Sequence, residues 1–225
     1  HRDLHSFPTR RSSDLDFGFT EPYFYNKDMI LGVDLFKIKT TYADESSYDN
    51  DTIGTGFRLG YMVTDKTRHV WNYSYKDEEI QGVKAGASEF ISNQKGQYST
   101  SAISHKLTYF GVNDRFAPTK GTTWNFANQL AGLGGTISFF KSDIKHDFFY
   151  SVTDNYVLST HLKAGYIFGY NDDKVKLKDR YFLGADSFPG FETAGIGPRD
   201  TTSTNKDALG GNSMYSIRTE LKFPI

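Results

Sequence analysis

The strongest constraint on the fold is an alternation of side chains with a period of two residues. Within residues 53–64, the apolar or aromatic Phe57, Leu59 and Tyr61 alternate with small or charged residues such as Arg58. Successive side chains of a β-strand point to opposite faces. The pattern therefore predicts a strand with one apolar face and one polar face.

The same alternation recurs along the chain and predicts a series of strands. They are expected at residues 16–20 (the end of a strand), 29–41, 53–64, 68–79, 98–113, 122–132, 136–150, 156–168 and 213–223. Most are longer than the roughly 5–6 residues of an average soluble strand. They match or exceed the ~9–11 residues that cross a bilayer at a tilt, so we expect membrane-spanning strands.

The lengths of the connections alternate as well. Those at residues 20–28, 65–67, 114–120 and 153–155 are short to moderate, those at 42–52, 80–97 and 169–211 are long and polar, and 131–135 is the short member of the second set. Short turns at one end and long loops at the other are typical of outer-membrane barrels. The alternative is a soluble up-and-down barrel such as a lipocalin, with an apolar interior and shorter strands.

Composition agrees with a barrel that has one lipid face and one wet face. Phe, Tyr and Trp make up 16% of the chain alongside 21 glycines, yet no apolar run approaches the ~20 residues of a spanning helix. The net charge of −1 gives no basic face for a nucleic-acid partner. Cysteine is absent, which excludes disulfides and thiolate metal sites within these residues.

The alternation assigns side chains to the two faces of the predicted barrel. The lipid face is expected to carry Phe57, Leu59, Tyr61, Trp124, Phe126, Leu162, Tyr166, Ile217 and Leu221. The lumen face is expected to carry Arg58, Lys163, Arg218, Glu220 and Lys222. This arrangement follows the apolar-out, polar-in pattern of membrane barrels.

Residues 1–15, HRDLHSFPTRRSSDL, differ in character from the rest of the chain. They lack the apolar core of ~7–15 residues that a signal peptide needs. Their sequence is similar to that of a translated adapter, so we expect a non-native leader. The alternative is a genuine polar loop. The barrel domain is accordingly predicted over residues 16–225.

We expect no catalytic residue, no metal and no cofactor. The histidines lie on separate predicted strands without the spacing of metal ligands: His69, His105, His146 and His161. No nucleophile elbow occurs, and Gly132, Gly134 and Gly135 form no phosphate-binding loop because no Lys-Ser/Thr follows them. Asp143 and Asp147 are interpreted as solvated residues of the barrel wall.

The most specific motif lies in the long connection. Residues 179–200 read DRYFLGADSFPGFETAGIGPRD, and residues 209–225 read LGGNSMYSIRTELKFPI. Together with the turn segments NDRFAPTKG at 113–121 and TEPYF at 20–24, they resemble the barrels of the BamA/TamA surface-antigen superfamily. The resemblance extends over about residues 16–225.

In that superfamily the corresponding loop is the sixth extracellular one, which folds back into the lumen and presents a V/I/L-R-G-F tip. Phe188, Gly190 and Phe191 match this tip, but Pro189 stands where the family has Arg. The residues downstream match closely: Gly195, Ile196, Gly197, Pro198, Arg199 and Asp200. The resemblance therefore implies that residues 170–211 form a lumen loop.

The resemblance also implies a partner for the loop on the inner wall. The family's tip Arg is thought to reach a wall carboxylate, which strand alignment places at Glu220. Since Pro189 cannot supply the charge, Arg218 or Arg199 remains as a partner for Glu220. We expect Arg218, because residues two apart on one strand share a face and need no loop ordering.

The resemblance implies a fold and a function for the chain. The fold is an incomplete transmembrane antiparallel β-barrel of about 8–9 strands, from the end of the fourth to the twelfth of sixteen, with POTRA domains and the remaining strands expected outside it. The function is that of a BamA-type factor that folds and inserts barrel proteins into the outer membrane of a Gram-negative bacterium. Its expected partners are outer-membrane lipid, unfolded outer-membrane protein clients and, through POTRA domains, accessory lipoproteins. The alternatives are a TamA-like barrel, a two-partner secretion exporter and, from another class, a passive porin.

Overall fold

The computed structural model describes residues 10–42, 44, 46–153 and 155–223, and its main feature is one antiparallel sheet. Nine strands form it in sequence order, each hydrogen-bonded to the next. They are β1 (Arg10–Glu21), β2 (Met29–Thr41), β3 (Asp49–Thr64), β4 (Thr67–Gln81), β5 (Gly96–Val112), β6 (Gly121–Gly135), β7 (Phe139–Thr153), β8 (Tyr156–Gly169) and β9 (Ser213–Lys222). The predicted all-β fold and its order of strands are thereby confirmed.

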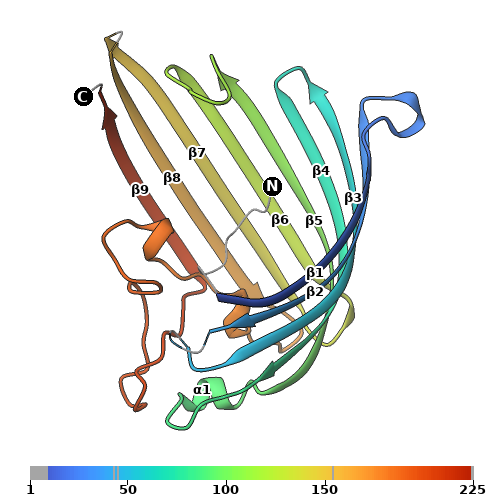
Figure 1. Ribbon diagram of the computed structural model, residues 1–225, viewed down its shortest axis with the longest axis vertical. Helices are drawn as coiled ribbons and strands as arrows, with labels where there is room; N and C mark the ends of the chain where they lie inside the picture. Colours follow the sequence, from blue (N-terminus) through green and yellow to red (C-terminus); the bar gives the residue numbers. More distant parts are fainter. Residues whose placement is uncertain (1–9, 43, 45, 154, 224–225) are drawn as a thin grey trace.

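The sheet is strongly curved and open (Figure 1). Within the described residues, β1 pairs only with β2 and β9 pairs only with β8. This agrees with the expected incomplete barrel of about 8–9 strands. Each edge strand presents backbone N–H and C=O groups that no described strand satisfies.

Several strand bounds differ from those predicted by the alternation, among them the starts of β3 and β7. β3 begins at Asp49 rather than at residue 53, because the polar stretch before Ile53 pairs with the end of β2. β7 begins at Phe139 rather than at residue 136, since residues 136–138 form the turn from β6. At the start of β3, polar side chains hide the period of two although the backbone ladder continues.

β1 reaches further toward the N-terminus than the predicted domain boundary. The expected strand end began at Asp16, whereas Arg10 pairs with Thr41 and a register shift occurs between Arg11 and Ser13. Residues 10–15 are therefore part of the sheet as described. The non-native origin of residues 1–15 stays a prediction, and residues 1–9 lie outside the described residues.

The connections fall into two sets at opposite ends of the sheet (Figure 1). One end has the turns 22–28, with the short helix η1 (Phe24–Asn26), then 65–66, 113–120 and the turn between β7 and β8. The other end has the connections 42–48, 82–95, 136–138 and 170–212, with α1 (Glu89–Ser92), η2 (Leu177–Asp179) and η3 (Ala185–Ser187). We call these the turn end and the loop end. No helix in the described part of the chain is both long and apolar enough to span a membrane.

The register confirms the assignment of side chains to two faces. Directly paired residues share a face, and Leu162 pairs with Ile217 whereas His161 pairs with Arg218. Followed from ladder to ladder, this register places all residues of the expected apolar set on one face and all of the polar set on the other. Ile217 is 62% exposed and Leu221 is 52% exposed, as expected for a face that meets no other part of the described chain.

The buried core lies at the loop end, between the sheet and its long connections. One cluster joins three connections and contains Tyr42, Tyr48, Ile80, Ile91, Leu177, Ala194 and Ala208. A second cluster lies against the wall and contains Ala102, Ala131, Ile137, Phe139, Ile167, Val175 and Tyr181. The long connection is thus packed against the sheet by apolar burial as well as by polar contacts.

Candidate functional site

The long connection between β8 and β9 forms the candidate site together with the face of the sheet that it covers. In Figure 1 this connection leaves the loop end, and its orange part, with η3, turns back toward the middle of the sheet's height. Tyr181 shows which face it covers, because its hydroxyl donates to Asp143 Oδ1 at 2.9 Å. Asp143 shares its face with the expected lumen residues. We call this the inner face.

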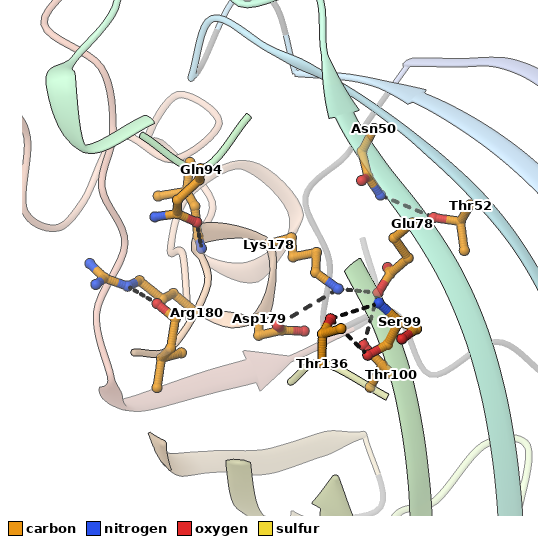
Figure 2. Close-up of polar contacts among 12 residues, drawn as sticks. Asn50, Thr52, Glu78, Gln94, Ser99, Thr100, Thr136, Lys178, Asp179 and Arg180 are labelled. Carbon is orange, nitrogen blue, oxygen red and sulfur yellow. Dashed lines mark hydrogen bonds and ion pairs between the residues drawn. The ribbon is translucent and has the colours of Figure 1, made fainter. Parts of the chain in front are cut away.

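The first part of the loop, residues 177–181, contacts the wall through several strands, and we call it the loop root. Leu177 N donates to Gln94 Oε1 at 2.9 Å, and Lys178 forms an ion pair with Glu78 of β4 (Figure 2). Lys141 Nζ of β7 donates to the carbonyl oxygen of Asp179 at 3.1 Å. Burial of the Asp179 carboxyl raises its pKa, whereas the neighbouring carboxylates of Asp179 and Glu78 outweigh burial and raise the pKa of Lys178.

Tyr181 sits tightly against the wall. Lys141 Nζ lies 4.5 Å from the centre of its ring. A Cβ atom at Gly165 would come within 2.6 Å of Tyr181 Cζ and 2.7 Å of Asp143 Oδ1, so only glycine permits this approach. Burial and the Asp143 carboxylate raise the pKa of Tyr181. Asp143 was expected to be a solvated wall residue, and the structure corrects this because Asp143 accepts the Tyr181 hydroxyl.

The loop tip is a compact turn. Gly184 has φ of 141°, and Ser187 Oγ accepts from its N–H at 2.9 Å. Phe188 and Phe191 stack edge to face with ring centres 5.4 Å apart. Between them, Pro189 and Gly190 are exposed, and Gly190 adopts φ of 91°. The structure therefore brings the predicted tip residues together as an apolar turn without a charged side chain.

The motif downstream of the tip folds back on the loop and reaches α1. Leu183 and Ile196 form a bridge, and Arg199 donates to the carbonyl oxygens of Ala194 and Lys206 at 3.1 and 3.0 Å. Arg199 is therefore a brace within the loop. Gly197 takes a φ of 129°, a conformation that suits glycine, between Ile196 and Pro198.

Asp200 and Asp207 fasten the loop to the other two long connections. Asp200 Oδ2 accepts from Ser88 Oγ at 2.6 Å, and this bond, with those from Thr202, lowers the pKa of Asp200 to about 2. Asp207 Oδ2 accepts from Ser88 N at 2.6 Å, while its Oδ1 accepts from Ser47 Oγ at 2.7 Å. These contacts join the connections 42–48, 82–95 and 170–212 into one unit, which we call the cap.

The wall pair predicted on β9 is present. Arg218 Nε lies 2.8 Å from Glu220 Oε1, and both side chains are on the inner face. Nearby, Nδ1 of His161 on β8 lies 2.6 Å from Oδ1 of Asp147 on β7, so Asp147 is also partnered rather than only solvated. Within the described residues, no hydrogen bond or ion pair joins the tip, Phe188 to Phe191, to this wall pair. The role of these residues as a functional site stays a prediction.

Two of the histidines, His69 and His105, form a hydrogen-bonded row that the sequence did not predict. His69 and His105 lie side by side on the outer face, with Nε2 of His69 3.4 Å from Nδ1 of His105. Tyr61 Oη lies 3.0 Å from His69 Nδ1, and Asn128 Nδ2 lies 3.0 Å from His105 Nε2. We call this row the outer ladder. Over the part of the chain that the structure describes, three or more His, Cys, Asp or Glu side chains nowhere gather as metal ligands would.

Comparison with known proteins gives consistent matches to barrel-assembly proteins. The Omp85 superfamily domain matches residues 6–225. An outer membrane protein assembly factor BamA of Neorickettsia risticii (strain Illinois) is 31% identical over 214 residues, which are 95% of this chain and 28% of that protein. A sorting and assembly machinery component 50 homolog A of Xenopus laevis is 27% identical, over 98% of this chain and 46% of that protein.

A solved structure shows the same fold. The crystal structure of BamA from Haemophilus ducreyi lacking POTRA domains 1–3 superposes with a TM-score of 0.83 at 20% identity, covering 94% of this chain and 45% of that one. At this identity the match concerns the fold alone. The chain spans 28% of the length of the bacterial relative named above, and less than half of the length of the Xenopus relative.

Proposed function

This chain belongs to the Omp85 superfamily, and on that premise we propose that it is part of the barrel of an outer-membrane β-barrel assembly factor. The observation that carries the proposal is the long loop fastened to the inner face by Tyr181 on Asp143 and Lys178 on Glu78. A long loop held against the inner wall fills part of the lumen, as in barrels whose interior is plugged by a loop. The named relatives, which are assembly proteins, support this reading over a secretion exporter.

The proposed location is the outer membrane of a Gram-negative-type bacterium. The apolar outer face, with Phe57, Trp124 and Ile217, would meet lipid, and the polar inner face would meet water and the loop. The turn end would face the periplasm and the loop end the exterior, because outer-membrane barrels have short periplasmic turns and longer outer loops.

The proposed mechanism follows from the chemistry of the bilayer. Hydrocarbon cannot hydrogen-bond a free backbone, so a client sheet must find a partner edge while it inserts. Strand addition to a barrel edge supplies those hydrogen bonds. In this proposal β1–β9 supply wall and loop, the clients are unfolded outer-membrane proteins, and accessory lipoproteins bind elsewhere in the full-length protein. No catalytic group takes part.

Replacement of the cell's resident assembly factor tests the proposal. Cells depleted of that factor would receive the full-length protein that carries this segment, and folded barrel proteins would be measured by their heat-dependent mobility on gels. Restored folding of several unrelated barrel proteins is expected. Steady pore conductance without any restored folding would contradict the proposal and favour a porin.

A further inference from the structure

We propose that the loop root works as a two-point latch, with Lys178 on Glu78 and Tyr181 on Asp143, which holds the long loop on the inner face independently of its tip. The four residues are positioning residues of the loop. The position of the loop can be measured without any client, so only the consequence of the latch in cells rests on the proposed function.

The first point of the latch is a buried ion pair. The Lys178 side chain is 6% exposed and the Glu78 side chain 9% exposed. Thr100 Oγ1 donates to the same Glu78 oxygen at 3.2 Å, so the carboxylate is held from the wall side as well (Figure 2). Loss of Lys178 leaves the buried Glu78 carboxylate without its ion-pair partner, whereas after loss of Glu78 the Lys178 ammonium keeps only Asp179 Oδ2, at 3.8 Å.

The second point is three strands away. Tyr181 crosses to Asp143 on β7, and Lys141 of the same strand lies over its ring and donates to the loop backbone at Asp179. The missing side chain at Gly165 opens the space that the tyrosine occupies. This close approach identifies a built seat for the tyrosine rather than a chance surface contact.

The two points together brace the curved sheet. β4 and β7 are not neighbours, since β5 and β6 lie between them. A short loop segment that ends on Glu78 at one side and on Asp143 at the other therefore fixes the separation of the two strands. Within the described residues the tip makes no polar contact with the wall. The polar attachment comes from the root and from the start of the loop, where the Tyr170 hydroxyl donates to Ala131 O and Asp173 Oδ2 accepts from Ser138 N.

Proteolysis of the folded protein tests the latch. Purified full-length protein in detergent would be treated with trypsin, and cleavage after Arg180 would be followed by mass spectrometry. Arg180 is braced by Leu209 O at 3.2 Å and by stacking on Phe90, so the closed loop should resist cleavage there. The Glu78→Gln/Asp143→Asn double variant should be cleaved at least roughly tenfold faster, since each point loses its carboxylate.

Two further variants separate the latch from general loss of structure. Glu79→Gln removes a carboxylate from the opposite face of the same strand and should leave cleavage unchanged. Glu78→Gln/Lys178→Met/Asp179→Asn removes all three charges at the first point, including the Asp179 carboxylate 3.8 Å from Lys178 Nζ. It should be cleaved more slowly than Lys178→Met alone, because no buried charge is left without a partner. Heat-dependent mobility on gels would confirm that each variant is folded.

The outcomes decide the latch and the proposed function separately. The latch would be refuted if the folded Glu78→Gln/Asp143→Asn variant were cleaved no faster than the wild-type protein. It would also be refuted if Glu79→Gln were cleaved as fast as that double variant. Faster cleavage of the latch variant alone supports the latch even when the wild-type protein restores no barrel folding in cells. A failure of the wild-type protein to restore barrel folding would count against the proposed function only.

Discussion

Arg218 Nε lies 2.8 Å from Glu220 Oε1 on the inner face of β9, and the side chains are 41% and 38% exposed. The two residues are neighbours on one strand face, so their pairing needs no loop. The resemblance to the BamA/TamA superfamily predicts a tip Arg at this carboxylate, whereas the tip here has Pro189. Arg218 is the cation that lies beside Glu220.

Restoring the tip charge should be tolerated. In the full-length protein, Pro189→Arg is expected to keep or improve barrel assembly, because Glu220 is accessible and already carries a guanidinium partner. Pro189→Ala serves as the control that removes proline without adding charge. A loss of assembly with Pro189→Arg but not with Pro189→Ala would show that the carboxylate can no longer receive a tip Arg.

Removing the wall carboxylate should have a small effect. Glu220→Ala is expected to lower the free energy of unfolding by less than about 1 kcal/mol, since exposed ion pairs contribute little. Denaturant unfolding in lipid vesicles measures this. A much larger loss would mean that Glu220 has a further partner in the full-length protein.

A charge on the outer face should be costly, and its neighbour provides the control. Ile217→Arg is expected to destabilise the inserted barrel by about 2–4 kcal/mol if residue 217 lies near the middle of the bilayer. Ser216→Arg, one residue away on the inner face, should cost far less because the lumen is wet. Equal destabilisation of the two variants would contradict the assignment of faces.

The loop root should respond to pH through Asp179. Its carboxyl is buried, and its Oδ2 accepts no hydrogen bond but lies 3.8 Å from Lys178 Nζ; burial outweighs this ammonium and raises the pKa of Asp179. An acid with a raised folded pKa stabilises the folded state most below its unfolded pKa, and this contribution is lost as pH rises through the folded pKa. Resistance of the root to trypsin should therefore fall with rising pH in the wild type. Asp179→Asn should abolish that fall and keep the root resistant; an unchanged pH profile would refute the assignment.

The stability of the cap should depend on pH in the opposite sense, through Asp200. Hydrogen bonds from Ser88 and Thr202 lower its pKa to about 2, so its contribution is present above the unfolded pKa and is lost as pH falls toward 2. Hydrogen exchange of the amides in α1 should accelerate over that interval. In Asp200→Asn the acceleration should be weaker, and an identical profile in the variant would exclude Asp200 as the cause.

The outer ladder should show strong coupling between its histidines. His105→Leu leaves His69 Nε2 and the Asn128 amide without their partner and should cost about 1–3 kcal/mol. The double variant His69→Leu/His105→Leu should cost clearly less than the sum of the two single variants. Additive costs in denaturant unfolding would show that the ladder's hydrogen bonds do not interact.

The sequence predicts the strands and their faces well because both follow from a local pattern. A period of two residues places Ile217 and Arg218 on opposite faces without any knowledge of their neighbours. The latch could not be predicted in this way. Lys178 and Glu78 are one hundred residues apart, and alternation tells only that Glu78 shares its face with other polar residues.

Asp143 illustrates the same limit. Alternation assigned it to the wall and suggested solvent around it, since no local signal connects it with Tyr181. Gly165 was the available signal, because a glycine inside an otherwise regular strand often marks a close approach of another chain segment. The start of β3 cannot be predicted from the alternation for a different reason. The polar residues before Ile53 continue the backbone ladder without an apolar face.

The neighbour-only order of the strands also bears on how the sheet can assemble. Each ladder from β1 to β8 closes a connection no longer than residues 82–95, so hairpins can form one after another at a modest entropic cost. The ladder between β8 and β9 must instead close residues 170–212, and each doubling of a flexible loop adds about 0.6 kcal/mol to its closure. A root that binds β4 and β7 first shortens the free chain that remains. Docking of the loop before β9 pairs would then speed the slowest hairpin, which makes the loop an aid to the barrel's own folding.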